Sequence, residues 1–194
     1  MTTSTDPRVA RTRQKLLEAA RLLLHERGPA GITHQNVAER AGIGRATVYR
    51  HWARPDDLLI DAIRGADRAL LGPLDGTLRD WLRRELRRLA AELSTPGAAS
   101  ALLAVAEYAG RDPDFADVRD AVQARTVAQL DDALRQATGD GMFDRRPPAT
   151  VLAAQLVGPL LFRTIFQALP VDDEFIDAVV DGALAHWSPS AADR

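Results

Sequence analysis

Apolar residues recur three and four positions apart along most of the chain, in stretches of helix length that glycine and proline interrupt. No stretch alternates apolar and polar residues for long enough to predict a β-strand. The pattern predicts an all-α protein of about nine helices. Their approximate ranges are 8–27, 33–41, 45–52, 55–71, 77–94, 98–110, 114–137, 148–168 and 173–187.

The second and third predicted helices are short, and Ala41-Gly42-Ile43-Gly44 joins them. Two short helices around a tight, glycine-containing turn are typical of a helix-turn-helix, whose second helix enters the major groove of DNA. Val48 and Trp52 lie four residues apart and are expected to pack inward. The outward-facing residues are then Arg45, Ala46, Thr47, Tyr49, Arg50 and His51.

The formal net charge of −2 is an average over two oppositely charged regions. Residues 1–54 carry ten Lys and Arg against four Asp and Glu, whereas residues 55–194 carry 15 against 23. A region with excess positive charge attracts polyanions, and an acidic region repels them. The charge distribution therefore predicts that the first region binds nucleic acid.

Residues 33–59 read THQNVAERAGIGRATVYRHWARPDDLL, which resembles the DNA-binding signature of tetracycline-repressor (TetR) family transcriptional regulators. The resemblance implies DNA contacts by Thr33, Gly44, Arg45, Ala46, Thr47, Tyr49, Arg50 and His51. One position departs from the pattern. Family members often have a phosphate-binding lysine before the acidic pair, where this chain has Pro55, and Arg54 is the candidate to replace it.

The resemblance also implies a domain organisation. A three-helix DNA-binding domain is expected over residues 1–55, with a connecting helix to about residue 72, and a helical ligand-sensing and dimerisation domain over residues 73–194. It further implies a homodimeric regulator, most often a repressor, that binds a palindromic double-stranded DNA operator and is released by a small-molecule effector. The last two predicted helices are too apolar to leave one face exposed to water, so we expect them to form the dimer interface.

An effector pocket needs apolar and aromatic lining with a few polar groups. The aromatic candidates in the second region are Trp81, Tyr108, Phe115, Phe162 and Phe166. Aromatic residues at helical spacing are more often plain core than ligand contacts. Both interpretations of these five residues stay open at the level of sequence.

Several other functions lack sequence support. The chain has no cysteine, its four histidines are scattered, and no residues have metal-ligand spacing, so neither a metal nor another cofactor is expected. A phosphate-binding loop, a dinucleotide fingerprint and a nucleophile with a nearby base are all missing, so we do not expect an enzyme. The alternative is an all-α small-molecule-binding protein or enzyme with a vestigial helix-turn-helix.

Neither a secretory signal nor a membrane span is predicted. The polar start MTTSTDP is not followed by an apolar core of 7–15 residues. The longest uncharged stretch, residues 147–162, is shorter than the roughly 20 residues that a spanning helix needs, and fits a buried helix of a soluble protein. A cytoplasmic location is therefore expected.

The charge argument predicts a strong salt dependence of DNA binding. If six to ten phosphates are neutralised, affinity should fall about 10³- to 10⁵-fold between roughly 50 and 200 mM salt, because binding releases condensed counterions. Fluorescence anisotropy of a labelled duplex over a salt series measures this slope. An affinity that hardly changes with salt would contradict the electrostatic argument.

Overall fold

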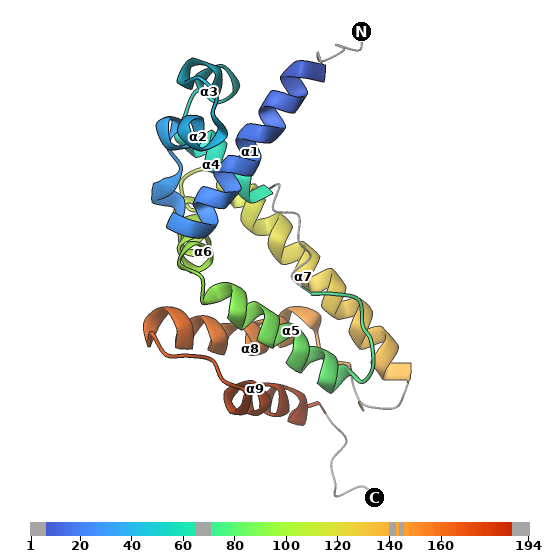
Figure 1. Ribbon diagram of the computed structural model, residues 1–194. Helices are drawn as coiled ribbons and strands as arrows, with labels where there is room; N and C mark the ends of the chain where they lie inside the picture. Colours follow the sequence, from blue (N-terminus) through green and yellow to red (C-terminus); the bar gives the residue numbers. More distant parts are fainter. Residues whose placement is uncertain (1–6, 65–70, 140–142, 144–145, 188–194) are drawn as a thin grey trace, which may run out of the picture. The chain divides into compact units, whose positions relative to one another are not determined.

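The computed structural model describes residues 7–64, 71–139, 143 and 146–187, and all regular structure in these ranges is helical, which confirms the all-α prediction (Figure 1). The described part of the chain contains nine α-helices, one 3₁₀ turn and one π-helical turn. In order, they are α1 (Pro7–Arg27), η1 (Pro29–Gly31), α2 (His34–Ala41), α3 (Arg45–His51), α4 (Pro55–Arg64), α5 (Leu78–Leu93), α6 (Pro96–Tyr108), α7 (Pro113–Gly139), α8 (Ala149–Leu161), the π-helical η2 (Phe162–Phe166) and α9 (Asp173–Ala185).

Most helix bounds lie within two residues of the expected ranges, and two of the expected helices need comment. The helix predicted over 55–71 is described as α4 up to Arg64, and residues 65–70 lie outside the described residues. The helix predicted over 148–168 is α8 followed by η2, in which the Gln167 N–H donates to the Phe162 carbonyl, five residues back. Pro159 lies inside α8 and removes one backbone hydrogen bond there.

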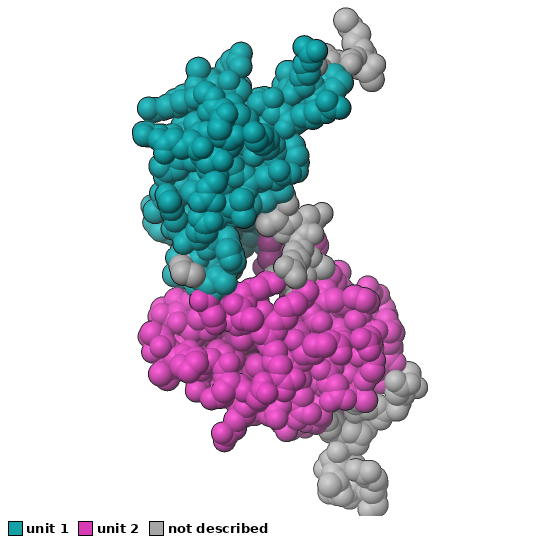
Figure 2. Space-filling model, viewed as in Figure 1, with its two compact units in different colours: residues 1–68, 95–119 teal, residues 69–94, 120–194 magenta. Residues whose placement is uncertain are grey.

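The chain divides into two compact units, coloured teal and magenta in Figure 2. The first comprises residues 1–68 and 95–119, and the second comprises residues 69–94 and 120–194. Helix α5 belongs to the second unit, although α4 and α6 belong to the first. Helix α7 contributes its start to the first unit and its remainder to the second.

Helix α1 is central to the first unit, where it packs against α2, α4 and α6. Its buried side chains are Leu16, Leu17, Ala19, Ala20, Leu23 and Leu24. Gly97 in α6 allows a very close approach to α1, since a Cβ atom there would lie 1.8 Å from the Leu24 carbonyl oxygen. Only glycine fits at this position, and α6 is thereby held against the end of α1.

Trp52, directly after α3, is buried and contacts two further helices of the first unit. Its indole Nε1 donates to Oδ2 of Asp61 in α4 at 2.7 Å. Arg13 of α1 lies over the ring, 5.1 Å from its centroid, and forms an ion pair with the same Asp61 oxygen at 2.5 Å. One side chain therefore joins α1, the end of α3 and α4.

The core of the second unit is formed by α5, the later part of α7, α8 and α9. Its largest fully buried side chains are Leu78, Trp81, Leu82, Leu86, Leu130, Leu134, Leu152 and Leu160. Three arginines of α5 form ion pairs with three aspartates of α9. These pairs are Arg79–Asp181, Arg83–Asp177 and Arg87–Asp173. Because both sets recur every four residues, the pairs form an antiparallel ladder between the two helices.

Ala149–Phe166, which comprises α8 and η2, is long and apolar enough to cross a membrane, judged by length and composition alone. No other unbroken helix among the described residues meets this test. This is weak evidence for a span, because core helices of soluble proteins pass the same test. Only 22% of the stretch is buried, which differs from the expected buried helix. Most of this apolar helix is therefore not covered within one chain.

The Trp52 contacts predict a stability effect. Replacing Asp61 by Ala should lower the free energy of unfolding by about 1–3 kcal/mol, because the partly buried indole N–H of Trp52 loses its acceptor. Urea unfolding measures the change. Arg13→Ala is the control, since losing this exposed ion-pair partner should cost only about 0–1 kcal/mol. An Asp61→Ala loss no larger than that of the control would contradict this account.

Candidate nucleic-acid interface

Local hydrogen bonds fix the turn between α2 and α3. Thr33 caps α2, and its Oγ1 accepts from the Asn36 N–H at 3.1 Å. Gly42 ends the helix with a φ of 63°, a left-handed conformation that favours glycine. The Ile43 N–H then returns to the Ala38 carbonyl at 3.0 Å. The turn geometry sets the direction in which α3 leaves α2.

The outward face of α3 carries the residues that the sequence predicted to lie there. Val48 and Trp52 are buried, as expected. Gly44, Arg45, Ala46, Tyr49 and Arg50, together with the cap Thr33, are exposed, whereas Thr47 and His51 are half-buried. The structure therefore places all eight predicted residues at the surface of the α2–α3 pair. Their contacts with DNA stay predictions.

The two arginines of α3 have neutral hydroxyl partners. Arg45 Nη2 donates to the Tyr49 hydroxyl at 3.0 Å, and Arg50 Nη2 donates to Thr47 Oγ1 at 3.1 Å. Within the described residues, neither guanidinium forms an ion pair with a carboxylate. Their positive charge is thus available to a phosphate or a guanine edge.

Tyr49 rests on a histidine that the sequence did not indicate as functional. The rings of His34 and Tyr49 stack at 4.0 Å between centroids. His34 is buried, and its Nε2 donates to the Trp52 carbonyl at 2.9 Å, since a carbonyl can only accept. His34 begins α2 directly after the Thr33 cap, and no periodic pattern marks it in the sequence.

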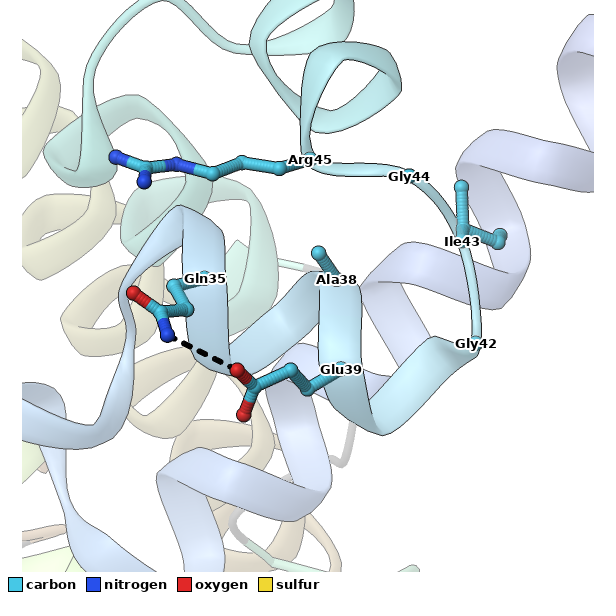
Figure 3. A pocket seen from close by; sticks show the side chains of 7 residues that line it. All are labelled: Gln35, Ala38, Glu39, Gly42, Ile43, Gly44 and Arg45. Carbon is cyan, nitrogen blue, oxygen red and sulfur yellow. Dashed lines mark hydrogen bonds between the residues drawn. The ribbon is translucent and has the colours of Figure 1, made fainter.

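A shallow depression of about 590 Å³ lies beside the start of α3 (Figure 3). It is lined by Gln35, Ala38, Glu39, Gly42, Ile43, Gly44 and Arg45. The Gln35 amide donates to Glu39 Oε1 at 3.0 Å on its α2 side. A Cβ atom at Gly42 or at Gly44 would meet no other atom within 4 Å, so the turn leaves this side open. Sequence spacing alone did not indicate Gln35 or Glu39 as site residues.

The charge states near the end of α3 follow from its neighbours. Partial burial lowers the pKa of His51, and Arg13 and Arg50 lower it further. This lowering favours the neutral form of His51 in the free protein. Arg54, the candidate replacement for the missing lysine, pairs with Asp56 at 2.9 Å, and Pro55 is the first residue of α4.

The five aromatic candidates for an effector pocket divide between the two units. In the first unit, Tyr108 and Phe115 stack on each other at 5.0 Å. In the second unit, Trp81 is fully buried in the core, whereas Phe162 and Phe166 are exposed and stack at 5.6 Å. Their role in binding an effector stays a prediction.

A metal site finds no support in the part of the chain that the structure describes, where no three His, Asp or Glu side chains could together hold an ion. Cysteine is absent from the sequence.

Two family models match the chain. The model described as bacterial regulatory proteins, tetR family, matches residues 16–62, which contain α2 and α3. The model described as tetracyclin repressor-like, C-terminal domain, matches residues 73–183. Together they account for both the helix-turn-helix and most of the remaining helices.

Individual proteins agree with the family models. The chain is 32% identical over 186 residues to the HTH-type transcriptional regulator Rv1556 of Mycobacterium tuberculosis, covering 93% of this chain and 90% of the relative. The crystal structure of the TetR family transcription regulator SCO0332 superposes with a TM-score of 0.70 at 29% identity, covering 92% of this chain and 99% of the other.

The multidrug binding protein EbrR, solved in complex with proflavin, shares the fold, with a TM-score of 0.64 at 23% identity over 89% of this chain and 99% of the other. The helix-turn-helix geometry, the two family models and the relatives agree. The chain belongs to the TetR family of ligand-responsive, DNA-binding transcriptional regulators.

Proposed function

We propose that this protein is a homodimeric repressor in which each protomer presents α3 to one half of a near-palindromic operator. The observation that carries this proposal is the outward face of α3, where Arg45 and Arg50 have hydroxyl partners and no carboxylate partner among the described residues. Two recognition helices of a dimer meet successive major grooves when they lie about 34–36 Å apart, or a multiple of that distance.

The proposed DNA contacts are Thr33, Gly44, Arg45, Ala46, Thr47, Tyr49, Arg50 and His51. Arg45 begins α3, the end of a recognition helix that reads base edges, so we assign it a base-reading role. Tyr49, Arg50 and His51 are assigned to phosphates, for which each has a suitable donor. Arg54 is exposed next to the start of α4 and takes the phosphate role of the missing lysine once it releases Asp56.

The proposed dimer interface consists of α8 and α9. On α8 and η2, the exposed apolar side chains include Val151, Phe162 and Phe166. On α9, the small residues Ala178, Gly182 and Ala185 are exposed and allow a close approach of another helix. Burying these faces against their copies in a partner would remove apolar surface from water.

Residues 1–55 are assigned to DNA binding, with the connecting segment to about residue 72, and residues 73–194 to effector sensing and dimerisation. The effector is proposed to be a small molecule, by analogy with EbrR, a multidrug binding protein solved in complex with proflavin. The indole N–H of Trp81 supports a polar contact with it, because this buried donor has no hydrogen-bond acceptor among the described residues. Effector binding would lower operator affinity by changing the distance between the two α3 helices, with a coupling of about 1–3 kcal/mol.

An enzymatic function is not proposed. Regulators of this family act by binding, and the proposed mechanism needs neither a catalytic group nor a metal or other cofactor. The location that fits a DNA-binding regulator is the cytoplasm.

The base-reading role of Arg45 predicts a sequence-dependent loss. Arg45→Ala should lower discrimination at particular base pairs by about 1–3 kcal/mol, because a bidentate contact to a base edge is removed. Selection from randomised duplexes, followed by affinity measurements on single-base variants, tests this. Arg27→Ala is the control, because Arg27 is an exposed arginine at the C-terminal end of α1, outside α2 and α3. An equal loss on every sequence would make Arg45 a phosphate contact only.

The proposed interface predicts that a charge on α8 weakens the dimer. Val151→Asp should raise the dimer dissociation constant at least about tenfold, because symmetry buries one unpaired carboxylate from each protomer. Leu103→Asp on α6 is a matched control, since Val151 is 43% and Leu103 45% exposed. Sedimentation equilibrium measures both variants. Equal dimer affinity in the two variants would place the interface elsewhere.

A further inference from the structure

We propose that His34 is a positioning residue for DNA recognition, which holds Arg45 in its base-reading orientation through Tyr49. This inference rests on the proposed base-reading role of Arg45. His34 lies on α2 and is 4% exposed, so it does not itself meet DNA. It acts through a stack of three side chains in the order His34, Tyr49, Arg45.

The base of the stack is fixed by the end of α3. Trp52 is the C-terminal cap of α3, and its carbonyl accepts the His34 Nε2–H at 2.9 Å. The Trp52 side chain is itself held by Asp61 of α4 and covered by Arg13 of α1. The His34 ring therefore has one orientation, set by three helices of the first unit.

Tyr49 transmits this orientation to the surface. One face of its ring lies on His34 at 4.0 Å and nearly parallel, with 25° between the ring planes, while 45% of the residue remains exposed. Its hydroxyl accepts from Arg45 Nη2, and the Arg45 guanidinium carbon lies 5.3 Å from its ring centroid. A long, exposed arginine otherwise samples many rotamers. Contacts with the Tyr49 ring and hydroxyl restrict Arg45 before DNA arrives, which reduces the entropy lost on binding.

Two substitutions separate the ring of His34 from its hydrogen bond. His34→Phe keeps a flat ring against Tyr49 and removes the donor to the Trp52 carbonyl. His34→Gln keeps an N–H donor and removes the ring. The specificity ratio is the affinity for a selected duplex divided by the affinity for a scrambled one. If stacking orients Arg45, His34→Gln should lower this ratio about tenfold, which is part of the discrimination that one bidentate base contact contributes. His34→Phe should be less stable to heat yet keep the ratio within about twofold.

The specificity ratio compares the dissociation constants of two duplexes at one salt concentration. One duplex is selected by the wild-type protein from a randomised pool, and the other is a scrambled duplex of the same composition. Affinity for the scrambled duplex should change much less than affinity for the selected duplex, because the phosphate contacts proposed for Arg50, His51 and Arg54 do not depend on the His34 ring. His25→Gln, at an exposed position near the end of α1, is the matched control for the same chemical change.

A double-mutant cycle tests the route through Arg45. His34→Gln should cause no further loss of specificity in the Arg45→Ala background, because the side chain that it positions is gone. Losses that add independently, or a wild-type ratio in His34→Gln, would overturn the proposal and leave the base-reading role of Arg45 intact. A ratio that Arg45→Ala itself leaves unchanged would contradict the proposed role of Arg45, and the role of His34 in recognition would fall with it.

A measurement without DNA examines the positioning itself. The NMR order parameter of the Arg45 Nε–H bond in the free protein should fall in His34→Gln and stay at the wild-type value in His34→Phe and His25→Gln. A purely structural His34, which only fills space under α3, would leave the Arg45 order parameter unchanged in all three variants, and that result would overturn the proposal.

Discussion

The contacts of Trp52 are the interactions on which the DNA-binding surface depends. Its indole N–H binds Asp61 of α4, its ring faces Arg13 of α1, and its backbone carbonyl accepts from His34 of α2. A short helix such as α3 has little stability of its own and takes its position from tertiary contacts. Because these contacts meet at the residue that ends α3, they fix the direction of the exposed face that carries Arg45.

Arginine has different partners on α5 and on α3. On α5, Arg79, Arg83 and Arg87 are matched by aspartates of α9, so their charge is compensated within the chain. On α3, Arg45 and Arg50 donate to the hydroxyls of neighbouring residues, so no carboxylate of the described structure compensates their charge. The abundance of arginine therefore says little about function. The arginines proposed to contact DNA differ from those of α5 in having no carboxylate beside them in the described structure.

Much of the fold and part of the candidate site could be predicted from the sequence. Helical spacing predicted α1, α2 and α3 and the burial of Val48 and Trp52, because local periodicity records which face of a helix is covered. The close approach of α6 to α1 at Gly97 could not be predicted, since an isolated glycine does not name the backbone it will meet. For the same reason, the sequence did not single out His34, whose partners Tyr49 and Trp52 are set by the turn between α2 and α3.

The sequence by itself determined the helical class, the helix-turn-helix and the side chains that face outward from α3, because spacing, capping residues and glycine act within a few residues of the chain. Tertiary structure alone decided which distant groups meet. It stacked Tyr49 on His34, paired Trp52 with Asp61 and aligned the aspartates of α9 with the arginines of α5. Stacking and hydrogen bonding depend on distances of a few ångströms between segments far apart in the chain, and those distances exist only after the helices have packed.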